Sequence, residues 1–255
     1  MRVVFEIIIQ LKGNFHKEKN TRNFQVNNLK AGLSNNQLKI IAMFAMLTDH
    51  IGRVLLPKYE FLLIIGRLAF PIFSYMIAEG CKYTSNKIKY LLTVFGLGII
   101  CQTVFFIATD SLYQNILITF SLSILTAFSI DNFLKKKDFL SGLLLILELV
   151  GTVFISVFLP QIIKGNFNID YGIVGVFIPV FIRFAPNKNQ KIIIMTALLA
   201  VLACSMNSRQ WFALLAIPLI VLYNGKRGKM NLKYMFYIFY PVHLAVIYLV
   251  DMLIN

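Results

Sequence analysis

Apolar segments of about the length that crosses a membrane recur along almost the whole chain. The 255 residues are 58% hydrophobic and 14% charged, with a mean hydropathy of +0.73. A helix needs about 20 apolar residues to cross the roughly 30 Å hydrocarbon core of a bilayer. We expect nine such helices, at residues 36–56, 61–79, 88–109, 115–130, 139–159, 171–185, 192–206, 211–223 and 234–252.

The pattern predicts an all-α, polytopic integral membrane protein with a single transmembrane domain at residues 36–255. The sixth, seventh and eighth segments are shorter than the others. They are interpreted as extended helices, as tilted helices shielded by protein, or as one miscounted span. Residues 1–35 hold an apolar run that is too short to span and is followed by a polar stretch, which indicates a cytosolic or interfacial segment.

Lysine and arginine residues gather on alternate loops, as expected for a membrane protein, in which these residues concentrate on the cytoplasmic side. With the amino terminus inside, the main clusters of basic residues all fall inside. They lie at residues 82–89, 135–137, 183–191 and 226–233. Topology alone explains the net charge of +14, so no nucleic-acid partner is needed, although a basic inner surface also suits a ligand that carries phosphates. The expected location is the cytoplasmic membrane.

Asp49 and His50 lie inside the first apolar segment, and Arg67 lies inside the second. An ionisable group at membrane depth costs at least a few kcal/mol, so it marks a functional site by default. His50 and Arg67 are each seven residues from the expected outer turn, which places both about 10 Å below it. We expect Asp49 to pair with Arg67, or with Arg53 one turn away, and His50 to stay available for proton transfer. The alternative is a structural Asp–Arg pair beside a hydrogen-bonded histidine.

Lys39 lies eleven residues before His50, which is about three helical turns. The two side chains are therefore expected on one face of the helix, about 16 Å apart along its axis. That arrangement suits an extended ligand whose anionic head stays at the cytosolic surface while its reactive end reaches His50. Two alternatives stay open: Lys39 extends to the interface, as lysines at helix ends commonly do, or it pairs with Glu79 at the matching end of the second segment.

Four further polar residues are site candidates. His243 lies ten residues beyond Lys233, near the depth of His50, and Tyr240 offers another polar partner; the alternative for His243 is a hydrogen bond between helices. Glu148 lies near mid-membrane, either as a site acid or as a protonated core residue. Asp170 precedes the sixth segment, where a helix cap is its simplest interpretation. The three cysteines lack metal-ligand spacing, so no metal is expected.

Several stretches of the sequence resemble the TraX family. They are LKIIAMFAMLTDHIG from Leu38, GRLAFPIFSYMIAEGCKYTSNKIKYL from Gly66, DYG from Asp170, and QWFALLAIPLIVLYNGKRG from Gln210 followed by KYMFYIFYPVHL. The resemblance implies a polytopic acyltransferase of the bacterial inner membrane, in a family named for its association with amino-terminal acetylation of conjugative pilin. The family is also similar to larger membrane acyltransferases, whose first helix carries a basic residue, ten intervening positions and a histidine. Lys39 and His50 fit that spacing.

The resemblance further implies acyl transfer from acetyl-CoA, with His50 as the base. Asp49 is expected to orient the His50 ring, much as a carboxylate assists histidine in hydrolases, and Arg67 to stabilise the oxyanion. The donor's phosphates are expected among the inner basic residues. The candidate cofactor-binding residues there are Lys39, Glu79 and Tyr83. The acceptor is expected to be an amine or hydroxyl of a pilin, glycan or lipid, which makes the enzyme an N- or O-acetyltransferase.

Two other classes of function stay open. Buried Asp, Glu, His and Arg residues also build the proton relays of transporters and flippases. Against that class, the sequence shows no inverted repeat and no pair of interrupted helices. A non-catalytic assembly factor for a surface structure would use the same polar residues only for folding.

Overall fold

The computed structural model describes residues 32–163, 165–229 and 232–254, and helices account for most of them. The predicted amino-terminal segment therefore lies outside the described residues, apart from residues 32–35. All nine predicted segments are helical. In chain order the elements are α2 (Asn35–Val54), α3 (Glu60–Gly66), α4 (Ala69–Tyr83), α5 (Lys87–Thr109), α6 (Ile116–Lys136), α7 (Phe139–Val153), η1 (Phe154–Phe158), α8 (Leu159–Ile162), α9 (Gly172–Phe184), α10 (Lys188–Ser205), η2 (Ser208–Leu215), α11 (Ala216–Val221) and α12 (Lys233–Ile254).

Polar side chains fix where several helices begin. Ser34 and Gln37 form a reciprocal capping box at the start of α2, in which each side chain accepts a hydrogen bond from the other residue's backbone N–H. Asn86, Asn115 and Asn187 accept backbone hydrogen bonds at the starts of α5, α6 and α10. These caps satisfy N–H groups that a helix leaves unpaired at its first turn.

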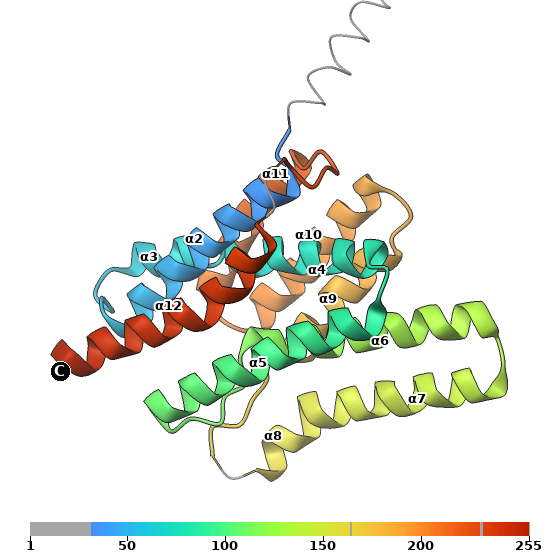
Figure 1. Cartoon of the computed structure of the whole chain (residues 1–255), viewed down its shortest axis with the longest axis horizontal. Coiled ribbons are helices and arrows are strands. Elements are labelled where there is room, and N and C mark those ends of the chain that lie inside the picture. Colours follow the sequence, from blue (N-terminus) through green and yellow to red (C-terminus); the bar gives the residue numbers. More distant parts are fainter. Residues whose placement is uncertain (1–31, 164, 230–231, 255) are drawn as a thin grey trace, which may run out of the picture.

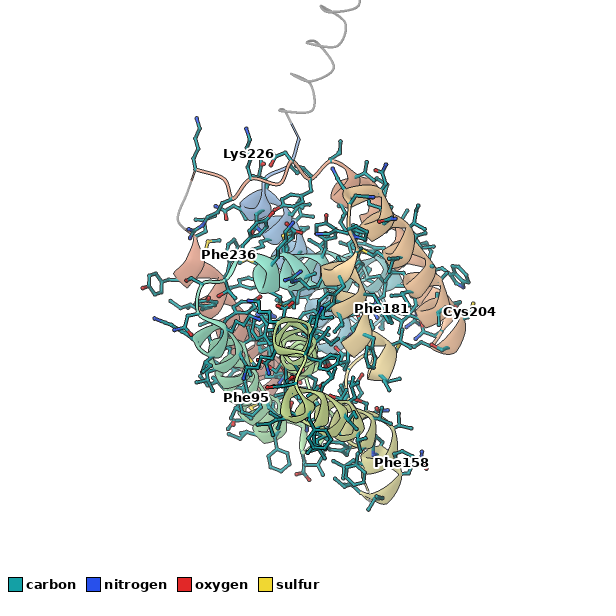
Figure 2. The ribbon with its side chains drawn as sticks, turned by 90° about the vertical axis from the view of Figure 1, so that its right-hand side faces the viewer. Phe95, Phe158, Phe181, Cys204, Lys226 and Phe236 are labelled. Carbon is teal, nitrogen blue, oxygen red and sulfur yellow. The ribbon has the colours of Figure 1, made fainter. Side chains whose placement is uncertain are left out.

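Six helical spans among the described residues are long and apolar enough to cross a membrane. They are Glu60–Tyr83, Lys87–Thr109, Ile116–Lys136, Phe139–Ile162, Lys188–Ser205 and Tyr234–Ile254. α2 has 20 residues but carries charged side chains, and α9 and η2 with α11 are short. The protein is therefore a multi-pass membrane protein, while the count of nine spans and the inward amino terminus stay predictions. Phe95, Phe158 and Phe181 are among the many large apolar side chains exposed on the outer surface, where they suit contact with lipid (Figure 2).

α4 lies at the centre of the bundle and packs against α2, α6, α9 and α11. Its fully buried Ile72 belongs to one core with Leu38 of α2, Ile124 of α6 and Ile178 of α9. α12 runs beside α2 and α5, whereas α7 lies along the outer side of α6 and continues through η1 into α8 (Figure 1). Of the helices that carry candidate site residues, α2 and α4 therefore lie at the centre of the bundle, whereas α7, which carries Glu148, is peripheral.

The helices alternate between two ends of the molecule, which we call the basic end and the opposite end. At the basic end Asn35 N–H donates to the Lys226 carbonyl, and Lys87 pairs with Asp131 at 2.9 Å. At the opposite end Gln114 N–H donates to the Asn168 carbonyl, and Arg209 pairs with Glu60 at 3.1 Å. The basic end holds the clusters that sequence analysis assigns to the cytoplasm.

Two neighbouring segments are interrupted inside the bundle. The span from Glu60 to Tyr83 breaks between α3 and α4 at Arg67 and Leu68, and η2 is a 3-10 helix that gives way to α11 after Leu215. η2 contacts both α3 and α4, so the interruptions lie together. The expectation that the chain has no pair of interrupted helices is therefore wrong. Pro218 at the start of α11 is a local signal, but Arg67 follows a glycine and no proline.

Candidate functional site

Asp49 and Arg67 form the predicted ion pair between α2 and the α3–α4 break. One Asp49 oxygen accepts a hydrogen bond from Arg67 Nη2, and the other accepts from Arg53 Nε at 2.6 Å. Arg67 is 7% exposed, and its Nη1 donates to Gln210 Oε1 at 3.0 Å. Gly66 permits the close approach, since a Cβ there would clash with the Asp49 carboxylate. Asp49 therefore pairs with Arg67 and with Arg53 at the same time, so both predicted partners are confirmed.

Gln210 is a site residue that sequence reasoning missed. Its side chain is 1% exposed, and it connects η2 to the Asp49–Arg67 pair through Arg67. Its position next to the start of an apolar segment resembles that of an ordinary interfacial residue. The signal that would have found it is the TraX-like stretch that begins with Gln210.

His50 pairs with His243 of α12. The distance between His50 Nδ1 and His243 Nε2 is 2.9 Å, and His243 Nδ1 lies 2.8 Å from the carbonyl oxygen of Phe239. The predicted similarity in depth between the two histidines is confirmed. The hydrogen-bond partner of His50 Nδ1 is thus His243, and the expectation that Asp49 orients this ring is wrong. Adjacent helical residues point in different directions, so when Asp49 faces Arg67, His50 faces α12.

A polar cavity of about 260 Å³ joins these residues near the opposite end of the molecule. α2 and the α3–α4 break contribute Asp49, His50, Arg53 and Arg67 to its lining, and α12 contributes Tyr240. Three of the interhelical loops close it: the loops that follow α5, α8 and α10. Charged and hydrogen-bonding groups from elements far apart in the sequence therefore converge on one cavity.

Asp170 also lines the polar cavity. Its Oδ1 accepts a hydrogen bond from the Tyr113 hydroxyl at 2.9 Å, and its backbone carbonyl accepts from Thr119 at 2.9 Å. The residue that caps α9 is Tyr171, whose φ is 60°, so the helix-cap interpretation of Asp170 is wrong. Burial raises the pKa of Asp170 to about 6, against the lowering effects of the Tyr113 hydrogen bond and the positive charge of Arg53.

The three predicted cofactor-binding residues meet at the basic end. Lys39, Glu79 and Tyr83 line an open cavity of about 580 Å³, together with Arg227. Lys39 Nζ lies 5.2 Å from the centre of the Phe236 ring. Glu79 forms a buried ion pair with Lys191 at 2.6 Å, so the alternative that Glu79 pairs with Lys39 is wrong. Lys191 and Arg227 belong to the inner basic clusters, among which the donor's phosphates are expected.

An apolar cavity of about 130 Å³ lies between the other two. It shares Lys39 and Phe236 with the cavity at the basic end, and it shares Ile116 and Tyr240 with the polar cavity. Along α2 the lining residues follow at helical spacing. They are Lys39 at the basic end, Met43 and Met46 in the middle, and Asp49, His50 and Arg53 in the polar cavity. The three cavities therefore form one row along the face of α2 that sequence analysis predicted.

Glu148 lies outside this row. Its Oε1 is 2.7 Å from the Thr126 hydroxyl oxygen and 2.8 Å from that of Thr152, so it joins α7 to α6. α7 contributes no residue to the lining of the three cavities. Of the two interpretations of Glu148, the structure favours a residue that holds two helices together.

Comparison with known proteins agrees with the resemblance in the sequence. Residues 34–251 match the family described as TraX protein. The chain is 29% identical over 246 residues to the probable fimbrial assembly protein FimC, serogroup H1, of Dichelobacter nodosus, an alignment that covers 83% of this chain and 93% of that protein. No solved structure matches the chain. Because the family match covers most of the sequence and includes every candidate site residue, this protein belongs to the TraX family.

Proposed function

We propose that the protein is an integral membrane acyltransferase, which takes an acyl group from acyl-CoA at the basic end and passes it to an amine or hydroxyl group in the polar cavity. The observation that carries this proposal is the row of three adjoining cavities from Lys39 to His50. A cationic mouth, an apolar passage and a polar chamber with a histidine match the successive parts of an acyl-CoA and its reaction partner.

The basic end suits the head of the donor. Lys39 and Arg227 both line its cavity, and clustered positive charge attracts phosphate groups. From Lys39 to His50 the helix rises about 16 Å, a distance comparable to the length of a pantetheine arm. The apolar lining in between, which includes Met43, Met46 and Phe120, suits a chain of low charge. Acetyl-CoA is the proposed donor.

The proposed reaction is a direct transfer with His50 as general base. The acceptor nitrogen or oxygen attacks the thioester carbonyl carbon, and His50 takes the proton that the acceptor loses. The negative charge that develops on the carbonyl oxygen is stabilised by Arg67, which Asp49 and Gln210 hold at the cavity. When the carbon–sulfur bond breaks, the proton on His50 passes to the sulfur, so the products are the acylated acceptor and CoA as the free thiol.

The acceptor is proposed to enter from the opposite end, where interhelical loops surround the polar cavity. With the amino terminus in the cytoplasm, this end faces away from the cytoplasm, so the acceptor belongs to the cell envelope. A pilin, a glycan and a lipid all offer suitable amine or hydroxyl groups. The relative in Dichelobacter nodosus is named as a probable fimbrial assembly protein, which supports a pilin-like acceptor in the bacterial cytoplasmic membrane.

The name of this relative also favours a second candidate, a non-catalytic assembly factor. The interrupted segments α3–α4 and η2–α11 favour a third, a transporter, because discontinuous helices frequently line transport sites. Both candidates predict that acyl-CoA is neither bound nor consumed. An assay for consumption of acetyl-CoA therefore distinguishes both candidates from the proposal.

The test is acyl transfer by the purified protein in lipid nanodiscs. Labelled acetyl-CoA is supplied with an envelope extract, and release of CoA and label in the acceptor are measured together. The wild-type protein should give both products, and His50→Ala should reduce transfer by about 100-fold or more, the usual contribution of a general base. Lys58→Ala, at an exposed position of the opposite end, is the control. A wild-type protein that leaves acetyl-CoA intact would refute the proposal.

A further inference from the structure

The number of N–H groups on a histidine ring determines which residue donates the hydrogen bond between His50 and His243. A neutral histidine ring carries one N–H, and its other nitrogen can only accept a hydrogen bond. The Phe239 carbonyl oxygen can only accept, so the hydrogen on the 2.8 Å contact belongs to His243 Nδ1. With its one N–H used there, neutral His243 has Nε2 as an acceptor, and the hydrogen on the 2.9 Å contact must come from His50 Nδ1.

We infer that His243 is a positioning residue that sets the tautomer of His50: it holds His50 in the Nδ1–H form, so that Nε2 of His50 is the unprotonated nitrogen that serves as base. The relay runs from the Phe239 carbonyl through His243 to His50. A second histidine thereby takes the place that a carboxylate occupies in hydrolases. This inference rests on the proposed function for its consequence in catalysis, and on hydrogen bonding alone for the tautomer itself.

The His50 and His243 rings have different surroundings, which indicate different roles. His50 lines the polar cavity, whereas His243 lines an apolar groove between α2 and α12 on the other side of the pair. His243 is 6% exposed, and its ring stacks on Phe239 at a centroid distance of 4.6 Å. His243 therefore lies where it can orient His50 without touching a molecule in the polar cavity. When His50 receives a proton on Nε2, the bond from its Nδ1–H to His243 Nε2 stays in place and stabilises the cation.

Nitrogen NMR of the histidine rings tests the tautomer directly. The chain has three histidines, so His16→Gln leaves only the signals of the pair. In nanodiscs at neutral pH, both rings should carry the proton on Nδ1, the opposite of the form that a free histidine side chain prefers in water. His243→Leu should return His50 to the Nε2–H form, and His243→Gln should keep the Nδ1–H form, because the glutamine amide oxygen reaches the position of Nε2 as an acceptor. Val242→Ala, on the half-exposed neighbouring position, should leave the spectrum unchanged and controls for changes in packing.

The same variants have distinct kinetics if the relay serves catalysis. His243→Leu should lower kcat for acyl transfer by about 10- to 100-fold with little change in KM for acetyl-CoA, the range found when hydrogen-bond partners that orient metal-bound histidines are removed. His243→Gln should stay within about threefold of the wild type. A His50 ring in the Nε2–H form in the wild type, or a folded His243→Leu protein with unchanged kcat, would overturn the inference. A wild-type protein with both rings in the Nδ1–H form but without acyl transfer would support the tautomer and overturn the proposed function.

Discussion

Neutralising Asp49 and Arg67, singly and together, tests whether these two buried charges stabilise each other. Asp49→Asn leaves the Arg67 guanidinium, whose side chain is 8% exposed, with neutral acceptors alone: the amide oxygen at position 49, Gln210 Oε1 and the Leu63 carbonyl. Removal of one partner from a buried ion pair typically costs about 3–5 kcal/mol. Arg67→Gln should cost less, about 1–3 kcal/mol, because Asp49 keeps Arg53 at 2.6 Å.

The double variant Asp49→Asn with Arg67→Gln removes both buried charges together. Its destabilisation should fall short of the sum of the two single changes by about 1–3 kcal/mol, the coupling expected for residues in direct contact. Unfolding free energies from denaturant titration in mixed micelles measure all four proteins of the cycle. Folded yield in membranes provides a second readout that does not depend on reversibility.

The ion pair between Glu60 and Arg209 is the matched control. Its side chains are 69% and 49% exposed, and its N–O distance is 3.1 Å. An exposed pair of this kind contributes about 0–1 kcal/mol, so the cycle of Glu60→Gln with Arg209→Gln should be close to additive. Additivity within about 0.5 kcal/mol for the Asp49 and Arg67 cycle as well would refute the reasoning that these two charges stabilise each other.

Three further predictions concern single residues. Because its pKa is raised from 3.8 to about 6, Asp170 contributes stability below about pH 4 that is lost as the pH rises through about 6. Thermal unfolding should therefore show that the free energy of unfolding of the wild type falls by about 1–3 kcal/mol relative to that of Asp170→Asn over that pH range. Glu148→Gln should keep the contacts with the two threonine hydroxyls and fold normally, whereas Glu148→Leu should lower folded yield and leave the kcat of the folded fraction unchanged. Lys39→Met should raise KM for acetyl-CoA by about tenfold with little effect on kcat, while Lys89→Met, exposed at the same end, should match the wild type.

Sequence periodicity predicted those parts of the site that lie on one helix or on one hairpin. The eleven-residue spacing from Lys39 to His50 placed both on the cavity-lining face of α2. The short connection between α2 and α3 fixes the register of the two helices, so similar depth below the turn correctly predicted contact between Asp49 and Arg67. Local geometry was sufficient because few alternative partners lie within reach of a side chain on a hairpin.

Helical periodicity and distance from a turn did not predict contacts between helices that are far apart in the sequence. Depth along the membrane normal placed His243 level with His50, yet every spanning helix presents some residue at that depth, and sequence alone does not say which helices are neighbours. Glu79 likewise pairs with Lys191, which follows 112 residues later, and not with the expected Lys39. Packing of small and large side chains across the whole bundle decides these pairings.

The position of Asp49 next to His50 in the sequence invited the one mechanistic expectation that failed, and the failure has a geometric cause. Successive residues of a helix differ by about 100° in direction, so one helix cannot present both side chains to the same partner. On α2 this divergence separates two tasks: Asp49 turns to Arg67 and holds the positive charge, while His50 turns to His243 of α12, which in turn contacts the Phe239 carbonyl. Both still line the polar cavity because it lies between those two directions. The adjacent acid and histidine of α2 therefore mark the place where this helix meets two different partners, the α3–α4 break and α12.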